Sequence, residues 1–433
     1  MIKEGIILKS TLIGTAILFT TTSVFADTLI LNADAALDVK TGKLLSPATI
    51  VVEDNTITSI SKRTPRNAPK NARIIDLDGH TLIPGLFDMH VHLTGDAQVH
   101  GYKRLRRTVP RSAITGVRNA KRTLAAGFTS VRNLGAGGYA DLALRDAIYD
   151  GDVPGPRIFA SGPALGITGG HCDNNLFTHE HQVTAAGVAD GPWAVRKKVR
   201  ENIKYGVDVI KFCATGGVLS KGTKVGAQQY SLEEMQALVA EVHLRGLTVA
   251  AHAHGTDGIK SAIRAGVDSV EHVSFLDDEA IKLALKHGTY FSMDIYNTEY
   301  ILGEGEKAGI LPESLDKERK VGAKQRASFS KAVEAGVNMV FGSDGGVYPH
   351  GDNGKQFSRM VKFGMTELQA LQAATINSAT LLKQQEKLGS LEAGKLADII
   401  AVPGNPLDNI TLMEQVTFVV KDGKVEVDKR TAK

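Results

Sequence analysis

The sequence has few cysteines and little net charge, and each shortage argues against a class of protein or partner. Only two of its 433 residues are cysteines, Cys172 and Cys213, which excludes a disulfide-dense scaffold. We expect both thiols to be free, because a chain of this length does not need a disulfide, although an oxidising compartment would permit one. The formal net charge of +4 gives no reason to expect a partner made of nucleic acid.

A long apolar run is missing everywhere after residue 26. Before that point, Lys3 and Lys9 precede a mostly apolar, uncharged stretch that ends with Val24 and Ala26 at the −3 and −1 positions. This pattern predicts a secretory signal peptide over residues 1–26, cut after Ala26. The stretch is short for a membrane span and Thr and Ser interrupt it, although an uncleaved anchor is an alternative. We therefore expect an exported protein, periplasmic or secreted, with no stable membrane insertion.

Two local features stand out from this ordinary composition. Residues 103–122 hold eight basic residues and no acidic one, which we interpret as a solvated helical face, with weak contact to an anionic surface as the alternative. The only tryptophan, Trp193, precedes a helical pattern and is expected to pack against the protein. His243 and His287 fall in helical segments and are expected at the surface.

What the chain does contain is two kinds of regular pattern. Residues 27–81 and 387–433 are rich in short alternating strands separated by Asn, Asp and Gly turns, which predicts one small β-domain built from both termini. Residues 82–386 alternate strands with helices instead. The candidate strands cover 86–93, 128–134, 156–162, 208–217, 248–255, 269–274, 290–295 and 338–346. This α/β pattern predicts a (β/α)8 TIM-like barrel with its active site at the carboxyl ends of the strands.

Polar side chains gather at those predicted strand ends. His90 and His92, in "LFDMHVHL", share one face of a strand because side chains alternate with period two. By themselves they could be hydrogen-bonded core histidines or metal ligands. Further candidates follow on later strands: Lys211, His252, His254, His272 and Asp344. Because imidazole and carboxylate suit zinc and similar divalent ions, the whole set favours a metal site.

These motifs resemble the amidohydrolase superfamily. The resemblance rests on "IPGLFDMHVHL", the strand-four lysine, the later histidines, the strand-eight aspartate and the closing "LGSLEAGKLADIIAVPGNPL", and it covers essentially the whole mature chain. A finer match lies in "IKFCATGGVLS", "AHAHGTDGI", "VEHVSFLDDE" and "SDGGVYPHGDN". These stretches resemble exported Xaa-Pro and Xaa-Arg dipeptidases, a prolidase-like group to which ochratoxin-hydrolysing amidohydrolases are similar.

The resemblance implies a site for two divalent ions, with zinc expected. His90, His92 and Asp344 would hold the more buried ion, and His252 and His272 the second. An N-carboxylated Lys211 would bridge both ions together with a hydroxide, since a carbamate turns a buried cation into an anion. Asp344 would then serve as general acid and base.

Other residues are expected to act around this site. His254 would support the neighbouring ligands. His171, on a glycine-rich loop after strand three, Tyr230, after strand four, and His350 would contact the substrate. The alternatives are a simple loop histidine for His171 and a packed tyrosine for Tyr230.

The sequence therefore predicts a hydrolase that cleaves the amide bond of a small molecule, either a dipeptide or an N-acyl amino acid. A cyclic-amide or imidazolone hydrolase of the same superfamily is the main alternative. A deaminase fits less well, because Ala253 and His254 follow His252 where a His-x-Glu motif is usual. A non-catalytic exported binding protein should have lost a ligand, and none is missing. We also expect a homo-oligomer.

Overall fold

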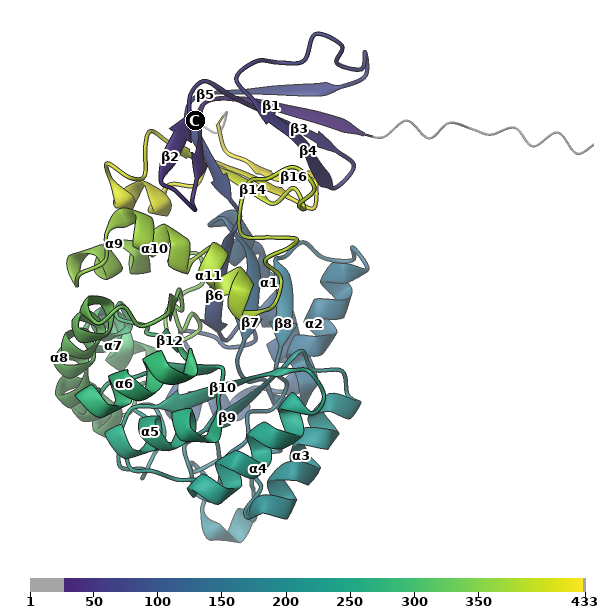
Figure 1. Cartoon of the computed structure of the whole chain (residues 1–433). Helices are drawn as coiled ribbons and strands as arrows, with labels where there is room; N and C mark the ends of the chain where they lie inside the picture. Colours follow the sequence, from purple (N-terminus) through teal and green to yellow (C-terminus); the bar gives the residue numbers. More distant parts are fainter. Residues whose placement is uncertain (1–26, 431–433) are drawn as a thin grey trace, which may run out of the picture.

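The computed structural model describes residues 27–430, and these form a (β/α)8 barrel with a β-sheet domain at one end (Figure 1). The predicted signal peptide lies outside the described residues. The barrel strands are β6 (Leu86–Val91), β7 (Phe128–Asn133), β8 (Arg157–Ala160), β9 (Val209–Cys213), β10 (Thr248–Ala253), β11 (Ser269–His272), β12 (Tyr290–Ser292) and β13 (Met339–Val340). The predicted fold class is confirmed.

The barrel strands are parallel and run as two arcs, β6-β7-β8 and β9-β10-β11-β12-β13. Parallel bridges between Leu165 and Phe212 and between Val91 and Gly345 join the arcs on both sides. Nearly every residue of these strands is buried, as expected for strands covered by helices outside and packed side chains inside.

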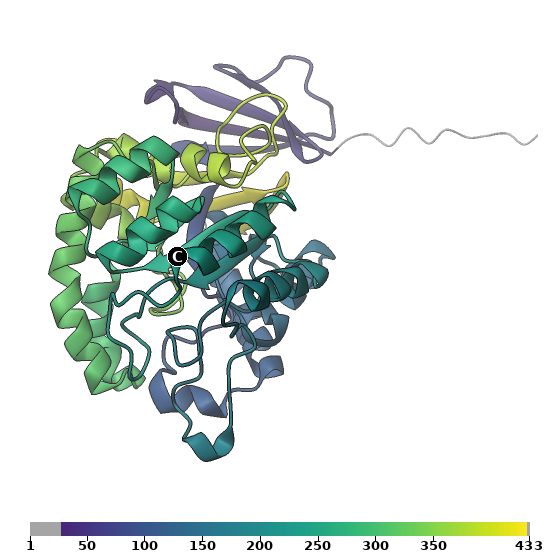
Figure 2. The ribbon, with the colours of Figure 1, turned by 60° about the horizontal axis from the view of Figure 1, so that its bottom comes forward.

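Helices surround the strands, and Figure 2 shows them from the side of the strand-to-helix loops. They are α1 (Val109–Ala125), α2 (Ala140–Tyr149), α3 (Pro192–Lys204), α4 (Leu232–His243), α5 (Thr256–Ala265), α6 (Asp278–His287), α7 (Asn297–Ala308), α8 (Pro312–Glu334), α9 (Lys355–Lys362), α10 (Glu367–Ala373) and α11 (Ile376–Leu381). Their ends follow local sequence rules. Ser231 caps α4 in a reciprocal capping box with Glu234, which fixes where that helix begins.

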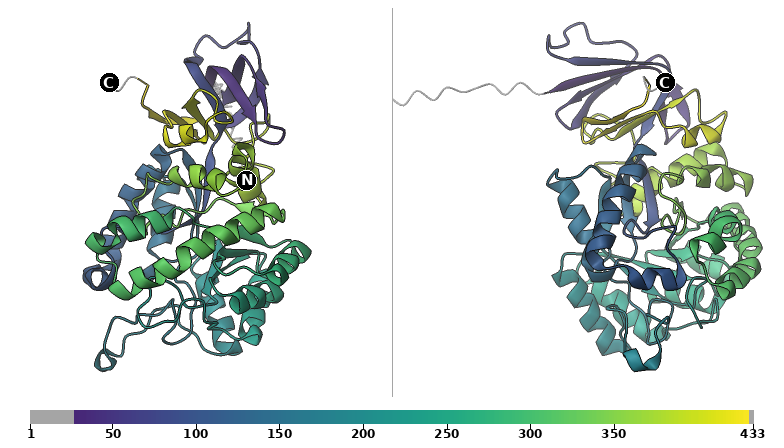
Figure 3. Two further views of the ribbon diagram at one scale, coloured as in Figure 1. Left: turned by 90° about the vertical axis from the view of Figure 1, so that its left-hand side faces the viewer. Right: turned by 180° about the vertical axis from the view of Figure 1, so that it is seen from behind.

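Both ends of the described chain meet in the β-domain (Figure 3). Its strands are β1 (Thr28–Asp38), β2 (Lys43–Leu45), β3 (Ala48–Glu53), β4 (Thr56–Ser61), β5 (Arg73–Pro84), β14 (Ile399–Pro403), β15 (Phe418–Lys421) and β16 (Lys424–Asp428). One sheet runs β16-β15-β14-β5-β1-β3-β4, so the two ends of the chain join where β5 pairs with β14. Since β5 leads directly into β6, the end of β6 that carries His90 points away from the β-domain.

Two expectations from the sequence are wrong. Cys172 and Cys213 form a disulfide rather than two free thiols, because the loop after β8 folds back along β9 and brings their Cα atoms to 6.0 Å across a separation of 41 residues. Trp193 does not pack into the protein. It lies in the first turn of α3 and is 82% exposed.

The basic run of residues 103–122 divides into two parts. Residues 103–106 belong to a short 3₁₀ helix, η1 (Gly101–Arg106), and residues 109–122 belong to α1, whose basic side chains are solvent-exposed. Arg107 and Thr108 connect the two helices. His243 and His287 are exposed at the ends of their helices. Within residues 27–430, no helix has both the length and the apolar character that crossing a membrane requires.

Candidate metal centre and active site

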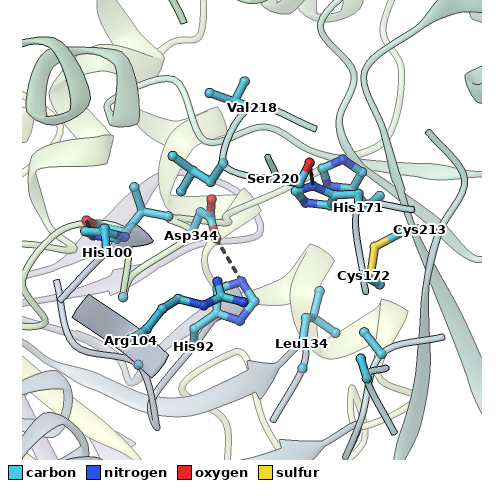
Figure 4. Close-up of a pocket in the computed structure, with 18 of the residues that line it drawn as sticks. His92, His100, Arg104, Leu134, His171, Cys172, Cys213, Val218, Ser220 and Asp344 are labelled. Atoms are coloured by element: carbon cyan, nitrogen blue, oxygen red, sulfur yellow. Dashed lines mark hydrogen bonds and ion pairs between the residues drawn. A yellow bond between two sulfur atoms is a disulfide. The ribbon is translucent and has the colours of Figure 1, made fainter. Parts of the chain in front are cut away.

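A cavity of about 600 Å³ opens at the carboxyl ends of the barrel strands (Figure 4). It is lined by side chains from nearly every strand end and by the loops that follow β8 and β9. Eight of the candidate site residues from the sequence lie on its wall: His90, His92, His171, Lys211, His252, His254, His272 and Asp344. The barrel therefore brings together side chains that are up to 254 residues apart, counting from His90 to Asp344.

One group of potential ligands forms where β6 meets the end of β13. Asp344 Oδ1 lies 3.1 Å from His92 Nε2 and 3.5 Å from His90 Nε2, so three ligand atoms face one point. Burial alone would raise the pKa of Asp344, but His90 and His92 hold it below its ordinary value. An ionised carboxylate beside two imidazoles is a suitable set of ligands for a divalent cation.

A second group forms at the ends of β10 and β11. Ligand atoms of His252, His254 and His272 lie within 4.8 Å of one another. Burial and the nearby imidazoles lower the pKa of His252 and His254 well below the ordinary value, which keeps both rings in the neutral form that binds metal. The Nδ1 atom of His254 lies 2.7 Å from the Ser274 hydroxyl, so this ring is also oriented by a protein partner.

Lys211 lies on β9, and its side chain reaches the same cavity. Only 3% of Lys211 is exposed, and among the described residues its Nζ has no hydrogen-bond partner. Burial lowers its pKa to about 8. An unpaired buried ammonium is costly, whereas a neutral amine can react with carbon dioxide to give a carbamate.

These features test whether the residues fit a pair of metal ions, and they do. Nitrogen atoms of Lys211 and His252 are buried without a hydrogen-bond partner in the described structure. A protein rarely leaves several buried polar atoms unsatisfied in one place unless something else binds them. The cavity thus holds two clusters of imidazoles, one of which includes the Asp344 carboxylate, together with Lys211. These residue types form a donor set for divalent ions.

Several supporting residues were not identified from the sequence. Asp294 Oδ1 lies 2.7 Å from His272 Nδ1, and Asn297 donates hydrogen bonds to both Asp294 and Asp344 at 2.6 and 3.0 Å. Such partners fix the orientation and tautomer of a ligating imidazole. Asp294 could have been found as an acidic residue at the end of predicted strand seven, but Asn297 lies in the helix beyond it and gave no signal.

A buried ion pair lies beneath the ligands. Arg132 donates to Glu271 at 2.7 Å, and the other Glu271 oxygen lies 3.1 Å from His90 Nδ1. Burial would raise the pKa of Glu271, but Arg132 and then His90 keep it below the ordinary value. Glu271 therefore stays ionised and holds the His90 ring in place.

Backbone conformation also distinguishes the site. His272 and Asp344 have φ angles of 72° and 56°, in the left-handed region that residues with a side chain seldom adopt. Such conformations cost free energy and persist where the surrounding structure enforces them, which is common at functional sites. His272 is the last residue of β11, Asp344 lies four residues beyond the end of β13, and both line the cavity.

The three predicted substrate contacts have different surroundings. His171 lines the cavity, stacks on His252 with ring centres 4.1 Å apart, and contacts Ser220 Oγ through Nδ1 at 2.8 Å. Tyr230 is 1% exposed, and its hydroxyl donates to the Ala189 carbonyl at 2.9 Å. Tyr230 is not on the cavity wall.

His350 is likewise buried outside the cavity wall. Its Nδ1 lies 3.0 Å from the Thr123 hydroxyl and its Nε2 lies 3.3 Å from the carbonyl of His92. These contacts support the backbone beside His92. Of the three, only His171 lies on the cavity wall.

Comparison with known proteins agrees with this arrangement. Residues 81–425 match the amidohydrolase family, and the chain belongs to that family. It is 33% identical to an ochratoxinase of Aspergillus niger, over 89% of this chain and 84% of that protein. The protein is accordingly a hydrolase that acts on amide bonds of small molecules, in a family whose members generally use divalent metals.

Two solved structures have the same fold over nearly their whole length. One is a Xaa-Pro dipeptidase with methionine bound in its active site, with a TM-score of 0.87 and 40% identity over 92% of this chain and 99% of that one. The other is a prolidase in complex with N-methylphosphonate-L-proline, with a TM-score of 0.84 and 33% identity, again over 92% and 99%. The chain thus belongs with the prolidase-like members of the superfamily.

Proposed function

We propose that this protein hydrolyses the amide bond to the carboxyl-terminal residue of a dipeptide or N-acyl amino acid, with two divalent ions in its cavity. One observation carries the proposal. The buried Lys211 lines the same cavity as a His–His–Asp group and a cluster of three histidines, and its Nζ has no partner among the described residues. The methionine and the proline derivative bound by the two related structures each include an amino acid, which supports this substrate class.

In this proposal, His90, His92 and Asp344 would hold one ion, His252 and His272 would hold the other, and a carboxylated Lys211 would supply a ligand to each. Zinc is the expected metal. When bound, such a pair of ions polarises a carbonyl group and lowers the pKa of water. His254, whose ring is oriented by its hydrogen bond with Ser274, supports the neighbouring ligands.

Asp344 is the residue that moves protons. Its Oδ1 faces His90 and His92, and its Oδ2 accepts a hydrogen bond from Asn297 at 3.0 Å. This arrangement fixes the carboxylate on the cavity wall, where it can accept a proton during attack on the amide and deliver it to the departing amine. A base held in one orientation is more effective than a freely rotating one.

We further propose that the protein works outside the cytoplasm, after removal of residues 1–26, and as a homo-oligomer. The disulfide between Cys172 and Cys213 supports the first of these points, because such bonds persist in oxidising compartments.

The test is a panel of dipeptides, N-acyl amino acids and cyclic amides assayed with purified protein of known metal content. We expect hydrolysis of substrates with a free carboxylate, close to two equivalents of metal by elemental analysis, and a large loss of both rate and metal in His90→Ala. Turnover confined to cyclic amides would favour the imidazolone-type alternative. Full activity in a metal-free preparation would contradict the proposed chemistry.

A further inference from the structure

One arginine on the cavity wall has no ion-pair partner for its guanidinium among the described residues. Arg104 belongs to η1, in the basic run of the sequence, and its side chain extends from that segment into the cavity on the side of His92 and Asp344 (Figure 4). No carboxylate of residues 27–430 lies within ion-pair distance of its guanidinium. Its neighbour Arg107, by contrast, is paired with Asp96 at 3.0 Å. Arg104 is therefore a charge that the protein has placed at the site without neutralising it.

The surroundings of Arg104 make that charge effective. Water still reaches the side chain, but enough protein surrounds the guanidinium to lower its pKa from the ordinary value. Burial lowers the pKa of His100, and the charge of Arg104 lowers it further, so this imidazole on the cavity wall remains neutral. Arg104 is thus a permanent positive charge on the same cavity wall as a neutral imidazole.

Unlike Arg104, the carboxylates on the cavity wall all have partners within the protein. Each already accepts a hydrogen bond or forms an ion pair within the protein: Asp96 with Arg107, Asp173 with three backbone amides, Asp294 with His272 and Asn297, Glu318 with Thr298, and Asp344 with His92. The cavity therefore offers a free cation for a substrate carboxylate but no comparable free anion for a substrate ammonium group.

We propose that Arg104 binds the free carboxylate of the substrate residue that hydrolysis releases as an amino acid. We further propose that the cavity does not require a charged amino terminus on the substrate. This inference rests on the proposed function and names the side of the substrate that the enzyme recognises. A planar guanidinium binds a carboxylate through two parallel hydrogen bonds, which orients the substrate as well as holding it. Substrates with a blocked amino terminus then remain acceptable.

The experiment compares three substrates that share one leaving residue: N-acetyl-L-methionine, N-acetyl-L-methioninamide and L-alanyl-L-methionine. In Arg104→Met, kcat/KM for the two carboxylate substrates should fall roughly 10- to 150-fold, the value of a hydrogen bond between charged groups. The amide substrate should change by less than about threefold. Arg104→Lys keeps the charge without the paired donors and should recover part of the loss.

Arg106→Met is the matched control, because Arg106 belongs to the same short helix, is exposed and does not line the cavity. It should leave all three substrates unchanged. Metal content should be equal in every variant, and binding of the product L-methionine, measured by calorimetry, should weaken in Arg104→Met alone.

The outcomes separate the two proposals. Hydrolysis of the carboxylate substrates with an unchanged preference over the amide in Arg104→Met would overturn the role of Arg104. A wild-type preference of more than about 100-fold for the dipeptide over its N-acetyl counterpart would show that an ammonium group is also recognised, and would overturn the one-sided charge requirement. A wild-type protein that cleaves none of the carboxylate substrates would instead contradict the proposed function.

Discussion

The β-domain and the mouth of the barrel are both buried, but they bury opposite kinds of side chain. The β-domain cluster consists of aliphatic residues and Phe418, with Leu31, Ile50 and Ile399 completely enclosed. The barrel mouth encloses imidazoles, a lysine and carboxylates, and leaves nitrogen atoms of Lys211 and His252 without partners among the described residues. Burying apolar surface stabilises a fold, whereas burying unsatisfied polar atoms destabilises it.

This difference shows that the β-domain stabilises the fold, whereas the barrel mouth destabilises it. The β-domain sheet needs no ligand to satisfy its interior. The barrel mouth also has residues in left-handed backbone conformations, at His272 and Asp344, and depends on the packed barrel to hold them. Changes in the two regions should therefore affect different measurements, and three experiments can sharpen or break the contrast.

The largest effect is expected from Lys211→Met, which keeps the apolar stem and removes the amine. We expect kcat/KM to fall by roughly 10³-fold or more and the binding of one metal equivalent to be lost. The free energy of unfolding of the metal-free protein should not fall, because an unpaired buried amine has been removed. The measurements are steady-state kinetics, elemental analysis and urea unfolding.

Lys197→Met is the control for this change, since Lys197 is exposed on α3. It should leave rate, metal content and stability unaltered. A Lys211→Met protein that retains two metals and normal activity would contradict the proposed difference between the two regions, because the buried amine at the barrel mouth would then have no role in metal binding or catalysis.

A change in the β-domain should have the opposite profile. Ile50 lies on β3 opposite Leu31 and is completely buried, so Ile50→Ala should lower the free energy of unfolding by about 2–5 kcal/mol through lost burial and a cavity. In the protein that remains folded, kcat/KM should change by less than about threefold. The exposed Lys43→Ala serves as control. A selective loss of activity at unchanged stability would contradict the division of roles.

The smallest effect is expected in acid, where the free energy of unfolding of the metal-free protein should fall. Burial lowers the pKa of His90 and His350 to about 4, so both rings are neutral when folded and gain protons on unfolding. The unfolded state binds more protons below the ordinary value of 6.5, so stability falls as the pH decreases from about 6.5 towards 4. Asp88 and Asp141 act in the opposite sense, because burial raises their pKa to about 6 and favours the folded state in acid.

Burial also lowers the pKa of His171, His252 and His254, and these three shifts, added to those of His90 and His350, outweigh the two carboxyls and His272, whose pKa Asp294 raises against the effect of burial. We expect a net loss of about 1–2 kcal/mol between pH 6.5 and 5.5, measured by urea unfolding after chelation. Zinc-loaded protein should lose less over this interval, since bound metal keeps the rings deprotonated. A chelated protein that is more stable at the lower pH would show that the mouth does not bury neutral histidines.

Local patterns in the sequence were sufficient for some features of this molecule. Period-two alternation predicted that His90 and His92 share a face, and the alternation of strands with helices predicted the barrel. Start signals such as the Ser231–Glu234 capping box are encoded within a few residues. Each of these depends only on backbone geometry over a short stretch of chain.

Other features depend on contacts between distant segments, which no local pattern contains. The sequence could not show that Cys172 and Cys213 meet, because their distance depends on the path of a loop. It suggested that Tyr230 and His350 touch substrate, whereas the structure buries the Tyr230 hydroxyl against Ala189 and His350 against Thr123. A residue near a strand end can face the cavity or the protein, and packing decides which.

The sequence by itself determined the residue types that this protein can use: histidines, a lysine and an aspartate at the ends of parallel strands, in the order typical of amidohydrolases. The tertiary structure alone decided which of these side chains converge, and which cation was left unpaired beside them. Arg104 shows the reason. In the sequence it is one of eight basic residues in a run that reads as a solvated face. Only the folding of η1 across the barrel mouth turns that charge towards the cavity, while its neighbour Arg107 is neutralised by Asp96.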